Sequence, residues 1–214
     1  MNSSLGVMVR PQYAWSYRVV KRAVDVVLAG LGLLLLAPLF PFIALAIKRS
    51  SRGPVLYRWY VVGQNGVPFM GYKFRTMVEN ADDLKKELLS QNEMNGPVFK
   101  MHNDPRVTPV GRVLRRFSLD ELPQLWSVLK GEMSLVGPRP PLVSEYAEFT
   151  EFQKQKLAVK PGITCLWQIS GRNEIRDFDE WVRLDLEYIS NWSLWLDFKI
   201  MLLTIPYVAR GTGR

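Results

Sequence analysis

The longest apolar run of the chain is VDVVLAGLGLLLLAPLFPFIALAIKRSSR, at residues 24–52. No charged residue occurs between Val26 and Ile47, and a straight helix of that length reaches about 33 Å, enough to cross the hydrocarbon core of a bilayer. Pro38 and Pro41 interrupt the run past its middle, where each proline removes a backbone donor and crowds the preceding turn. The pattern predicts a membrane-inserted helix that breaks near Pro38.

Basic residues flank this run on both sides, namely Lys21, Arg22, Lys48, Arg49 and Arg52. Because basic flanks stay in the cytoplasm, a spanning helix satisfies only one flank. A helix that enters, breaks and returns on the same side satisfies both. A re-entrant helix over residues 21–52 therefore stands against a bitopic helix with a proline kink, which membrane proteins also use. Residues 1–20 are expected to form an N-terminal tail.

After residue 52 the pattern becomes that of one compact catalytic domain, residues 53–214. Two β-rich runs within residues 53–77 flank Asn65-Gly66, a strong hairpin-turn signal. Residues 96–116 are rich in turn-forming proline and glycine. Helical spacing of apolar residues recurs in segments 80–93, 118–131, 145–159 and 177–211. The predicted fold class is mainly α with a small β-hairpin or sheet (α+β).

The last helical segment, residues 177–211, is aromatic and partly amphipathic. Its charged residues Asp197 and Lys199 argue against a second membrane span. Trp192, Trp195 and Tyr207 suit a helix that lies at the membrane interface, where amphipathic rings settle. Packing in the core is an equally open reading of these rings.

The chain carries 28 Lys and Arg against 20 Asp and Glu, a formal net charge of +8 at pH 7. This surplus favours anionic partners such as lipid headgroups, nucleotides and phosphates. Nucleic acid is not expected as a partner, because no helix-turn-helix, zinc or RNP pattern occurs. The single cysteine, Cys165, excludes an internal disulfide and agrees with a reducing cytoplasm.

The densest candidate for catalytic chemistry is RRFSLDELPQL, at residues 115–125. Ser118 followed three residues later by Glu121 is a capping-box pattern, so a purely structural role is one interpretation. In the functional interpretation Asp120, five residues after Arg115, stays ionised and attacks phosphorus to form an aspartyl-phosphate type intermediate. Glu121 is about 100° around a helix from Asp120, and it could hold Mg²⁺, which binds carboxylate oxygens and substrate phosphates.

Several cations are candidates for phosphate binding. Lys73 and Arg75 of YKFRTM lie on the same side of an extended strand, where two cations can clamp a diphosphate. Arg139 lies between prolines in the constrained loop SLVGPRPP (134–141) and is preorganised for bidentate phosphate binding. The structural alternatives are a solvated strand face for the first pair and an ordinary salt bridge for Arg139.

Three further features carry less information. NDPRV places Asp104 and Arg106 in a tight turn, where a structural role is favoured for the aspartate. The only histidine, His102, leaves a metal cluster or a Ser-His triad without support. PGITCLWQISGRN (161–173) could form one wall of a substrate pocket, with ring stacking on Trp167, or could serve packing alone.

Longer motifs resemble the bacterial sugar transferase family, the monotopic polyprenyl-phosphate phosphoglycosyl transferases. These motifs are KRAVDVVLA, SRGPVLY, YKFRTM, DPRVTPVGRVLRRFSLDELPQLWSVLKGEMSLVGPRP, KPGIT, WQISGRN and LDLEYISNWSLWLDFKIMLLT. They occur in this order and cover essentially residues 21–214. Chance similarity to the family does not account for several motifs of this length that occur in the same order.

The resemblance implies an activity. Members of the family move a sugar-1-phosphate from a UDP-sugar to undecaprenyl phosphate and release UMP, the first lipid-linked step of glycan assembly. They work at the bacterial inner (cytoplasmic) membrane, with the catalytic domain on the cytoplasmic face and in contact with membrane lipids. A homodimer is an open option for the assembly.

The resemblance also implies roles for residues. Asp120 is the expected nucleophile and Glu121 the expected Mg²⁺ ligand, so these two form the catalytic pair. The expected phosphate-binding cations are Lys73, Arg75, Arg115 and Arg139. The membrane element is expected to be re-entrant and broken at Pro38. Lys21, Arg22 and Asp25 match the family's motif at the point where this membrane element begins.

The chain departs from the family pattern at two positions. Val61 stands where many relatives have an arginine, so one cation that could touch substrate or lipid is missing. Cys165 stands where glycine is frequent, which removes some backbone freedom. Two other functions remain open: a transferase that moves the sugar alone and releases UDP, and a non-enzymatic scaffold that binds anionic lipids.

Overall fold

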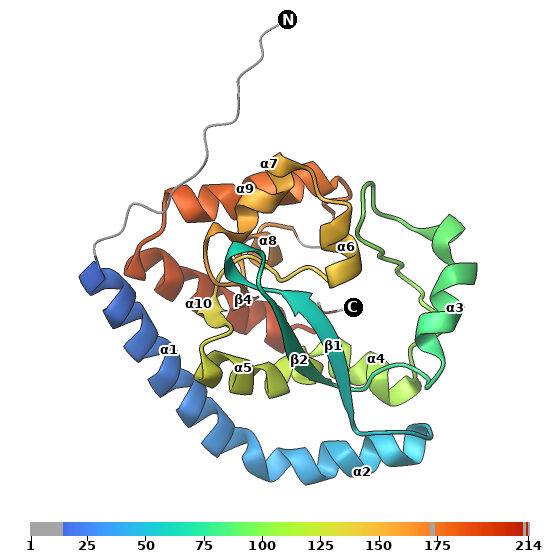
Figure 1. The fold of residues 1–214 in the computed structure, drawn as a ribbon. Coiled ribbons are helices and arrows are strands. Elements are labelled where there is room, and N and C mark those ends of the chain that lie inside the picture. The colour runs from blue at the N-terminus through green and yellow to red at the C-terminus, as the bar shows by residue number, and fades with distance from the viewer. Residues whose placement is uncertain (1–14, 172–173, 212, 214) are drawn as a thin grey trace, which may run out of the picture.

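The computed structural model describes residues 15–171, 174–211 and 213. The protein is mostly helical, with two small two-stranded β-sheets (Figure 1). This confirms the predicted balance of helix and strand. Most of the expected N-terminal tail, residues 1–14, lies outside the described residues. The remainder of that tail is helical, because the first helix begins at Trp15.

The apolar run forms helices α1 (Trp15–Leu36) and α2 (Phe40–Ser50), joined by the 3₁₀ turn η1 (Ala37–Leu39). Pro38 lies at the start of η1 and Pro41 at the start of α2, where a missing backbone N–H costs no hydrogen bond. The two helices meet at an angle and partly enclose the rest of the molecule (Figure 1). The structure thus has a 3₁₀ turn at the position of the predicted break, and the re-entrant path through a membrane stays a prediction.

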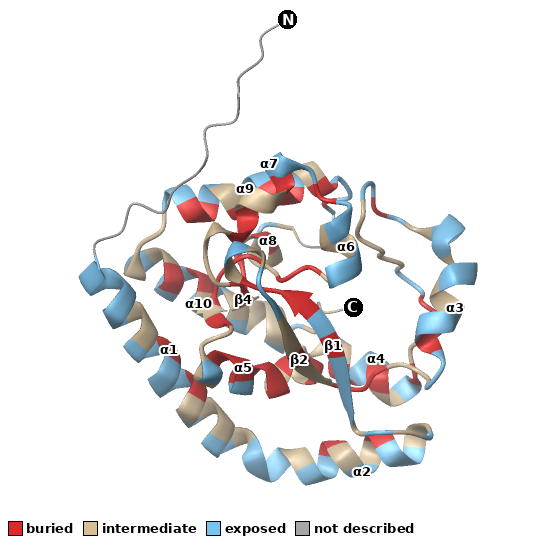
Figure 2. Cartoon of the chain, in the orientation of Figure 1, coloured by how far each residue is buried: buried red, intermediate tan, exposed pale blue. Residues whose placement is uncertain are grey.

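Most of α1 and α2 is exposed or half-buried (Figure 2). Residues 15–50 form, within the described part of the chain, the one helical segment long and apolar enough to cross a membrane. Leu34, Leu35 and Phe42 are among its most exposed apolar side chains. An exposed apolar surface of this extent marks a contact with lipid or another apolar partner.

Polar residues at the start of α1 attach it to the domain. Arg22 donates to the carbonyls of Val128 and Leu129, at 2.5 and 2.7 Å, and thereby caps the C-terminus of α5 (Leu125–Lys130) with a cation. Asp25 is buried and accepts from Ser134 Oγ and from the Leu135 amide, at 3.1 and 3.0 Å. These bonds place α1 along α5.

The predicted hairpin is present. Strands β1 (Leu56–Val62) and β2 (Pro68–Phe74) pair antiparallel, and the turn between them holds Asn65 at φ 58° and Gly66 at φ 78°. Both angles lie in the left-handed region that asparagine and glycine tolerate best. Val61 is fully buried in β1. The valine that was expected to replace a family arginine therefore packs inside the protein.

A second sheet was not predicted. Strands β3 (Ser134–Val136) and β4 (Gly162–Thr164) pair in parallel, so the start of the expected loop at 134–141 is a strand. A Cβ on Gly162 would lie 2.1 Å from the Gly137 amide nitrogen, and the close approach of the two chains therefore requires glycine there. This pairing joins segments that are far apart in the sequence. No local pattern of apolar residues therefore predicts it.

The remaining helices surround these sheets (Figure 1). Their bounds are α3 Ala81–Glu87, η3 Leu89–Gln91, α4 Pro109–Arg116, η4 Leu119–Gln124, α6 Val143–Ala147, α7 Glu151–Lys154, η5 Gln155–Ala158, α8 Leu166–Ile169, α9 Phe178–Ser190 and α10 Leu194–Ala209. Residues 96–116 were predicted to be rich in turns, and this prediction was wrong for α4, which is a regular helix. Thr108 caps this helix by accepting from Gly111 N at 2.9 Å, and Pro109 is its first residue, a combination that favours helix starts.

The aromatic residues of α10 and of the turn before it differ in exposure, some on the surface and others in the interior. Trp195 is 70% exposed, as a ring at the membrane interface would be. Trp192 donates to Asp197 at 3.1 Å, and Tyr207 donates to the Ile169 carbonyl at 2.9 Å. These two rings therefore contribute to packing within the domain.

Cys165 lies in an aromatic core cluster and is 2% exposed. Its φ of −149° is extended backbone that any residue adopts, so cysteine in place of the family's frequent glycine causes no strain. Burial, with a further contribution from the Asp185 charge, raises the pKa of the thiol to about 12. The thiol is therefore protonated at neutral pH and unreactive in the folded protein.

Candidate active site

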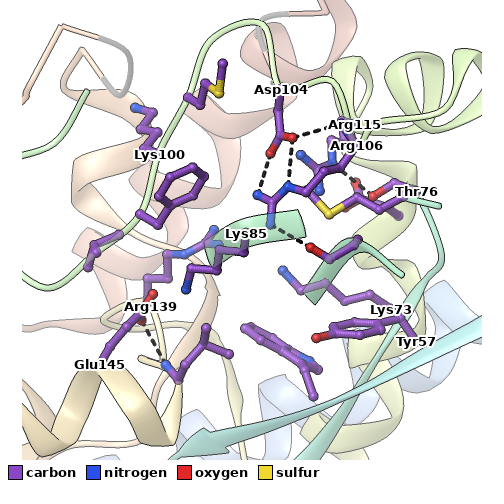
Figure 3. Close-up of a pocket in the computed structure, with 18 of the residues that line it drawn as sticks. Tyr57, Lys73, Thr76, Lys85, Lys100, Asp104, Arg106, Arg115, Arg139 and Glu145 are labelled. Carbon is purple, nitrogen blue, oxygen red and sulfur yellow. Dashed lines mark hydrogen bonds and ion pairs between the residues drawn. The ribbon is translucent and has the colours of Figure 1, made fainter. Parts of the chain in front are cut away.

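A cavity of about 390 Å³ lies between the hairpin β1–β2, the turn η4 and the loop that follows β3. Its lining includes all the residues predicted for catalysis and phosphate binding: Lys73, Arg75, Arg115, Asp120, Glu121 and Arg139. Figure 3 shows part of this cavity, with Lys73, Arg115 and Arg139 among the labelled side chains, which come from several separate elements. The fold thus brings together residues that the sequence places in three separate segments.

The acid pair is presented by the 3₁₀ turn η4 and not by a regular α-helix. Ser118, just before η4, has φ 52° and makes no side-chain cap, so the capping-box interpretation is wrong. The α-helical part of the expected helix 118–131 begins only at Leu125. Asp120 and Glu121 are each 9% exposed, and both carboxylates reach the cavity instead of capping a helix.

Glu121 lies between two cations. Lys73 Nζ donates to Glu121 Oε1 at 3.1 Å, and Arg139 Nη1 lies 3.7 Å from the same oxygen. Lys73 Nζ also lies 4.1 Å from the centre of the Trp59 ring, a cation–π contact. Burial lowers the pKa of Lys73, the Glu121 charge opposes this, and Arg139 adds to the lowering.

Asp120 faces a third cation. Burial lowers the pKa of Arg115, while the Asp120 charge acts in the opposite direction, so the carboxylate lies within electrostatic reach of this guanidinium. Arg115 Nε donates to Thr76 Oγ1 at 2.9 Å, which fixes the guanidinium at the edge of the hairpin.

Arg75 is oriented differently from Lys73. Its Nη2 donates to the Ser51 carbonyl at 2.8 Å, at the end of α2. Its Nε and Nη1 are buried and have no hydrogen-bond partner among the residues that the structure describes. The charged ends of Lys73 and Arg75 therefore engage different groups, one at Glu121 and the other at the loop after α2.

Asp104 and Arg106 form a buried ion pair at 2.6 Å. The Arg106 side chain also donates to the Ala81 carbonyl at 3.1 Å. It thereby ties the start of α3 to the turn before α4. The favoured structural role of Asp104 agrees with this geometry.

The cavity also contains charged residues that sequence reasoning missed: Lys85, Lys100, Glu145 and Lys156. Glu145 accepts from the Leu142 amide at 2.9 Å. Burial raises the pKa of Glu145, and this bond together with the Arg139 charge opposes the rise. Figure 3 shows Glu145 and Arg139 on the same side of the cavity. No spacing in the sequence marks these residues, because each reaches the cavity through tertiary packing.

The acid pair suits a metal that is shared with a substrate. Within the described residues no group of three or more His, Cys, Asp and Glu side chains could hold a metal ion alone. Mg²⁺ is usually bound through one or two carboxylates plus substrate phosphates and waters. Asp120 and Glu121 provide two adjacent carboxylates inside a cation-lined cavity, which fits such a shared site.

The pattern of the bacterial sugar transferase family matches residues 16–211 of the chain. The galactosyl transferase CpsE of Streptococcus agalactiae serotype III is 49% identical over 201 residues, which cover 94% of this chain and 44% of that protein. The undecaprenyl-phosphate galactose phosphotransferase of Salmonella typhimurium is 43% identical over 206 residues, 92% of this chain and 42% of that protein.

The exopolysaccharide production protein ExoY of Rhizobium meliloti is 44% identical over 197 residues, which cover 90% of this chain and 87% of that protein. The chain thus spans less than half the length of the first two relatives and most of the length of ExoY. The family pattern covers nearly all of α1 to α10, including the helix break and the acid pair. This chain belongs to the bacterial sugar transferase family.

Proposed function

We propose that the protein moves a sugar-1-phosphate from a UDP-sugar to undecaprenyl phosphate and releases UMP. The observation that carries this proposal is the buried acid pair Asp120 and Glu121 in a cavity with Lys73, Arg115 and Arg139. Such a cavity suits a diphosphate whose sugar-bearing phosphorus is attacked by a carboxylate. The names of relatives, including a UDP-glucose:undecaprenyl-phosphate glucose-1-phosphate transferase of Escherichia coli, point to the same substrates.

In the first step an Asp120 oxygen attacks the phosphorus that carries the sugar. A P–O bond forms to the carboxylate, the bond to the UMP oxygen breaks, and UMP leaves with that electron pair. In the second step an oxygen of undecaprenyl phosphate attacks the same phosphorus and releases Asp120. Nucleophilic catalysis of this kind divides one difficult transfer into two easier ones.

The cations stabilise charge that develops on the phosphoryl oxygens. Lys73, Arg115 and Arg139 surround the acid pair, and the contacts of Lys73 with Glu121 and of Arg115 with Thr76 hold two of them in position. Fixed charges in a partly desolvated site act strongly on a developing charge, because no solvent reorganisation is needed. Arg75, which is directed to Ser51, would support the end of α2 and not the phosphates.

Glu121 is the proposed Mg²⁺ ligand, together with phosphate oxygens of the donor. When bound, Mg²⁺ would neutralise charge on the diphosphate and favour departure of UMP. Glu121 now pairs with Lys73 and Arg139. The same two side chains could then bind the substrate phosphates while Glu121 binds the metal.

For the membrane element we propose the re-entrant path, at the cytoplasmic face of the bacterial inner membrane. The break at Ala37–Leu39 and the basic residues at both ends of the segment support it. Because Cys165 is buried, reporter cysteines are introduced at Arg18 and Arg52. Both are expected to react with a membrane-impermeant maleimide only from the cytoplasmic side of inverted vesicles. Labelling of the two positions from opposite sides would establish a bitopic helix instead.

Nucleotide release tests the function. Purified protein is incubated with undecaprenyl phosphate, Mg²⁺ and a panel of UDP-sugars. UMP is the expected product, and its release is expected to stop when EDTA removes the metal. Release of UDP would identify a transferase of the sugar alone. Tight liposome binding with no nucleotide release across the panel would favour a lipid-binding scaffold.

A further inference from the structure

We propose that a second, apolar cavity holds the first isoprene units of the acceptor lipid and delivers its phosphate to the acid pair from a different side than the nucleotide-sugar. This inference rests on the proposed function, because it assigns a place to the acceptor of that reaction. The cavity measures about 350 Å³. Its walls come from the end of α1, η4, β4, α8 and the C-terminal half of α10.

The two cavities meet at the acid pair. Ser118 and Glu121 line both of them, whereas Asp120 lines only the polar cavity. We place the acceptor phosphate at this shared wall, beside Glu121 and next to the Asp120 that would carry the phosphosugar.

The walls of the second cavity present mainly apolar atoms. Leu36, Leu122, Ile163 and Val208 are among them. Three of their polar neighbours make hydrogen bonds within the protein. Thr164 and Thr204 share a hydrogen bond of 2.6 Å between their hydroxyls, and Tyr207 donates to a backbone carbonyl. An apolar chain can line such walls without leaving a buried polar group unpaired.

The cavity lies next to the surfaces that a membrane would cover. Leu36 is the last residue of α1 before the break, and its neighbour Leu35 is 75% exposed. Val208 lies three residues, about one helical turn, after Ile205 on α10, and Ile205 is 62% exposed. A chain that leaves this cavity between α1 and α10 would pass directly into lipid, which suits a polyprenyl chain and not a soluble substrate.

The cations that would receive the acceptor phosphate lie on the polar side of Glu121, because Lys73 and Arg139 line the polar cavity and not the apolar one. Lys73 and Arg139 flank Glu121 at 3.1 and 3.7 Å, so the carboxylate there is compensated by two cations. The arrangement assigns separate routes to the two products. UMP leaves through the polar cavity, and the lipid-linked sugar leaves through the apolar one.

A cavity-filling variant tests this assignment against a matched control on the same helix. Val208→Trp places a large ring in the apolar cavity, and Ile205→Trp places the same ring on the exposed face. Val208→Trp is expected to raise the KM for undecaprenyl phosphate at least about tenfold while exchange of labelled UMP with the UDP-sugar stays within about twofold. Ile205→Trp is expected to change neither quantity. Equal loss of exchange and transfer in folded Val208→Trp protein would overturn the inference.

A second measurement does not depend on turnover. Wild-type protein in lipid nanodiscs is irradiated with a diazirine-bearing farnesyl phosphate, and the adducts are located by mass spectrometry. Adducts on Leu36, Ile163 or Val208 that undecaprenyl phosphate competes away would support the inference. Adducts confined to exposed positions such as Leu35 and Ile205 would overturn it. Absence of UMP exchange in the wild type would count against the proposed function alone, because the adduct map still decides where the chain binds.

Discussion

The variant Asp120→Asn is expected to lower UMP release by at least about 10³-fold, since it removes the nucleophile on which both chemical steps depend. The amide that replaces the carboxylate is neutral and poorly nucleophilic, yet it has nearly the same shape. The cations around it, Lys73, Arg115 and Arg139, keep their other contacts. The loss should therefore appear in kcat and not in the fold.

Asp83→Asn is the matched control, because Asp83 is an exposed acid on α3 whose carboxylate pairs only loosely with Lys86, at 3.8 Å. It should retain full activity. Wild-type protein incubated with a UDP-sugar labelled in the sugar should retain label on a denaturing gel, whereas Asp120→Asn should not. A folded Asp120→Asn protein with near-native release of UMP would contradict the covalent mechanism.

The variant Lys156→Met is expected to destabilise the folded protein by about 3–5 kcal/mol. Lys156 and Asp185 form an ion pair at 2.7 Å in which the side chains are only 2% and 1% exposed. Lys156 Nζ also lies 5.0 Å from the centre of the Trp181 ring. Removing the ammonium leaves the buried Asp185 carboxylate without its ion-pair partner, and this poorly compensated charge is the main cost.

The double variant Lys156→Met/Asp185→Leu is the corresponding control. Replacing a buried pair by apolar residues of similar volume is often neutral or stabilising, so the second substitution should recover most of the lost stability. Thermal unfolding in detergent should show a Tm lowered by roughly 10 °C for Lys156→Met and largely restored in the double variant. Equal Tm values for Lys156→Met and wild type would show that the pair contributes little.

Local features of the chain were predicted correctly from its sequence. The proline positions 38 and 41 predict the break because proline lacks a backbone donor, whatever surrounds it. Asn65-Gly66 predicts the hairpin because these residues tolerate a left-handed backbone. The resemblance to the family identified the acid pair, and the structure places both acids in one cation-lined cavity.

Other features depended on contacts between distant segments. Ser118 and Glu121 match a capping box in sequence, but Ser118 adopts φ 52° and Glu121 turns to Lys73 on β2, 48 residues earlier. Arg75 shares a side of the strand with Lys73, yet it bonds to the loop after α2. A local pattern cannot reveal such preferences, because they are set by the ion pairs and hydrogen bonds available after folding.

The amino-acid sequence alone predicted the long apolar segment with its proline interruption, the hairpin and the mixed fold class, and its motifs assigned the acid pair by resemblance to the family. Each of these follows from backbone constraints, hydrophobic periodicity or a motif within one stretch of chain. The tertiary structure decided the parallel pairing of β3 with β4, the buried Lys156–Asp185 pair and the place of Glu121 in the lining of two cavities. These features arise between residues far apart in the chain, where packing and desolvation, rather than local propensity, set the geometry.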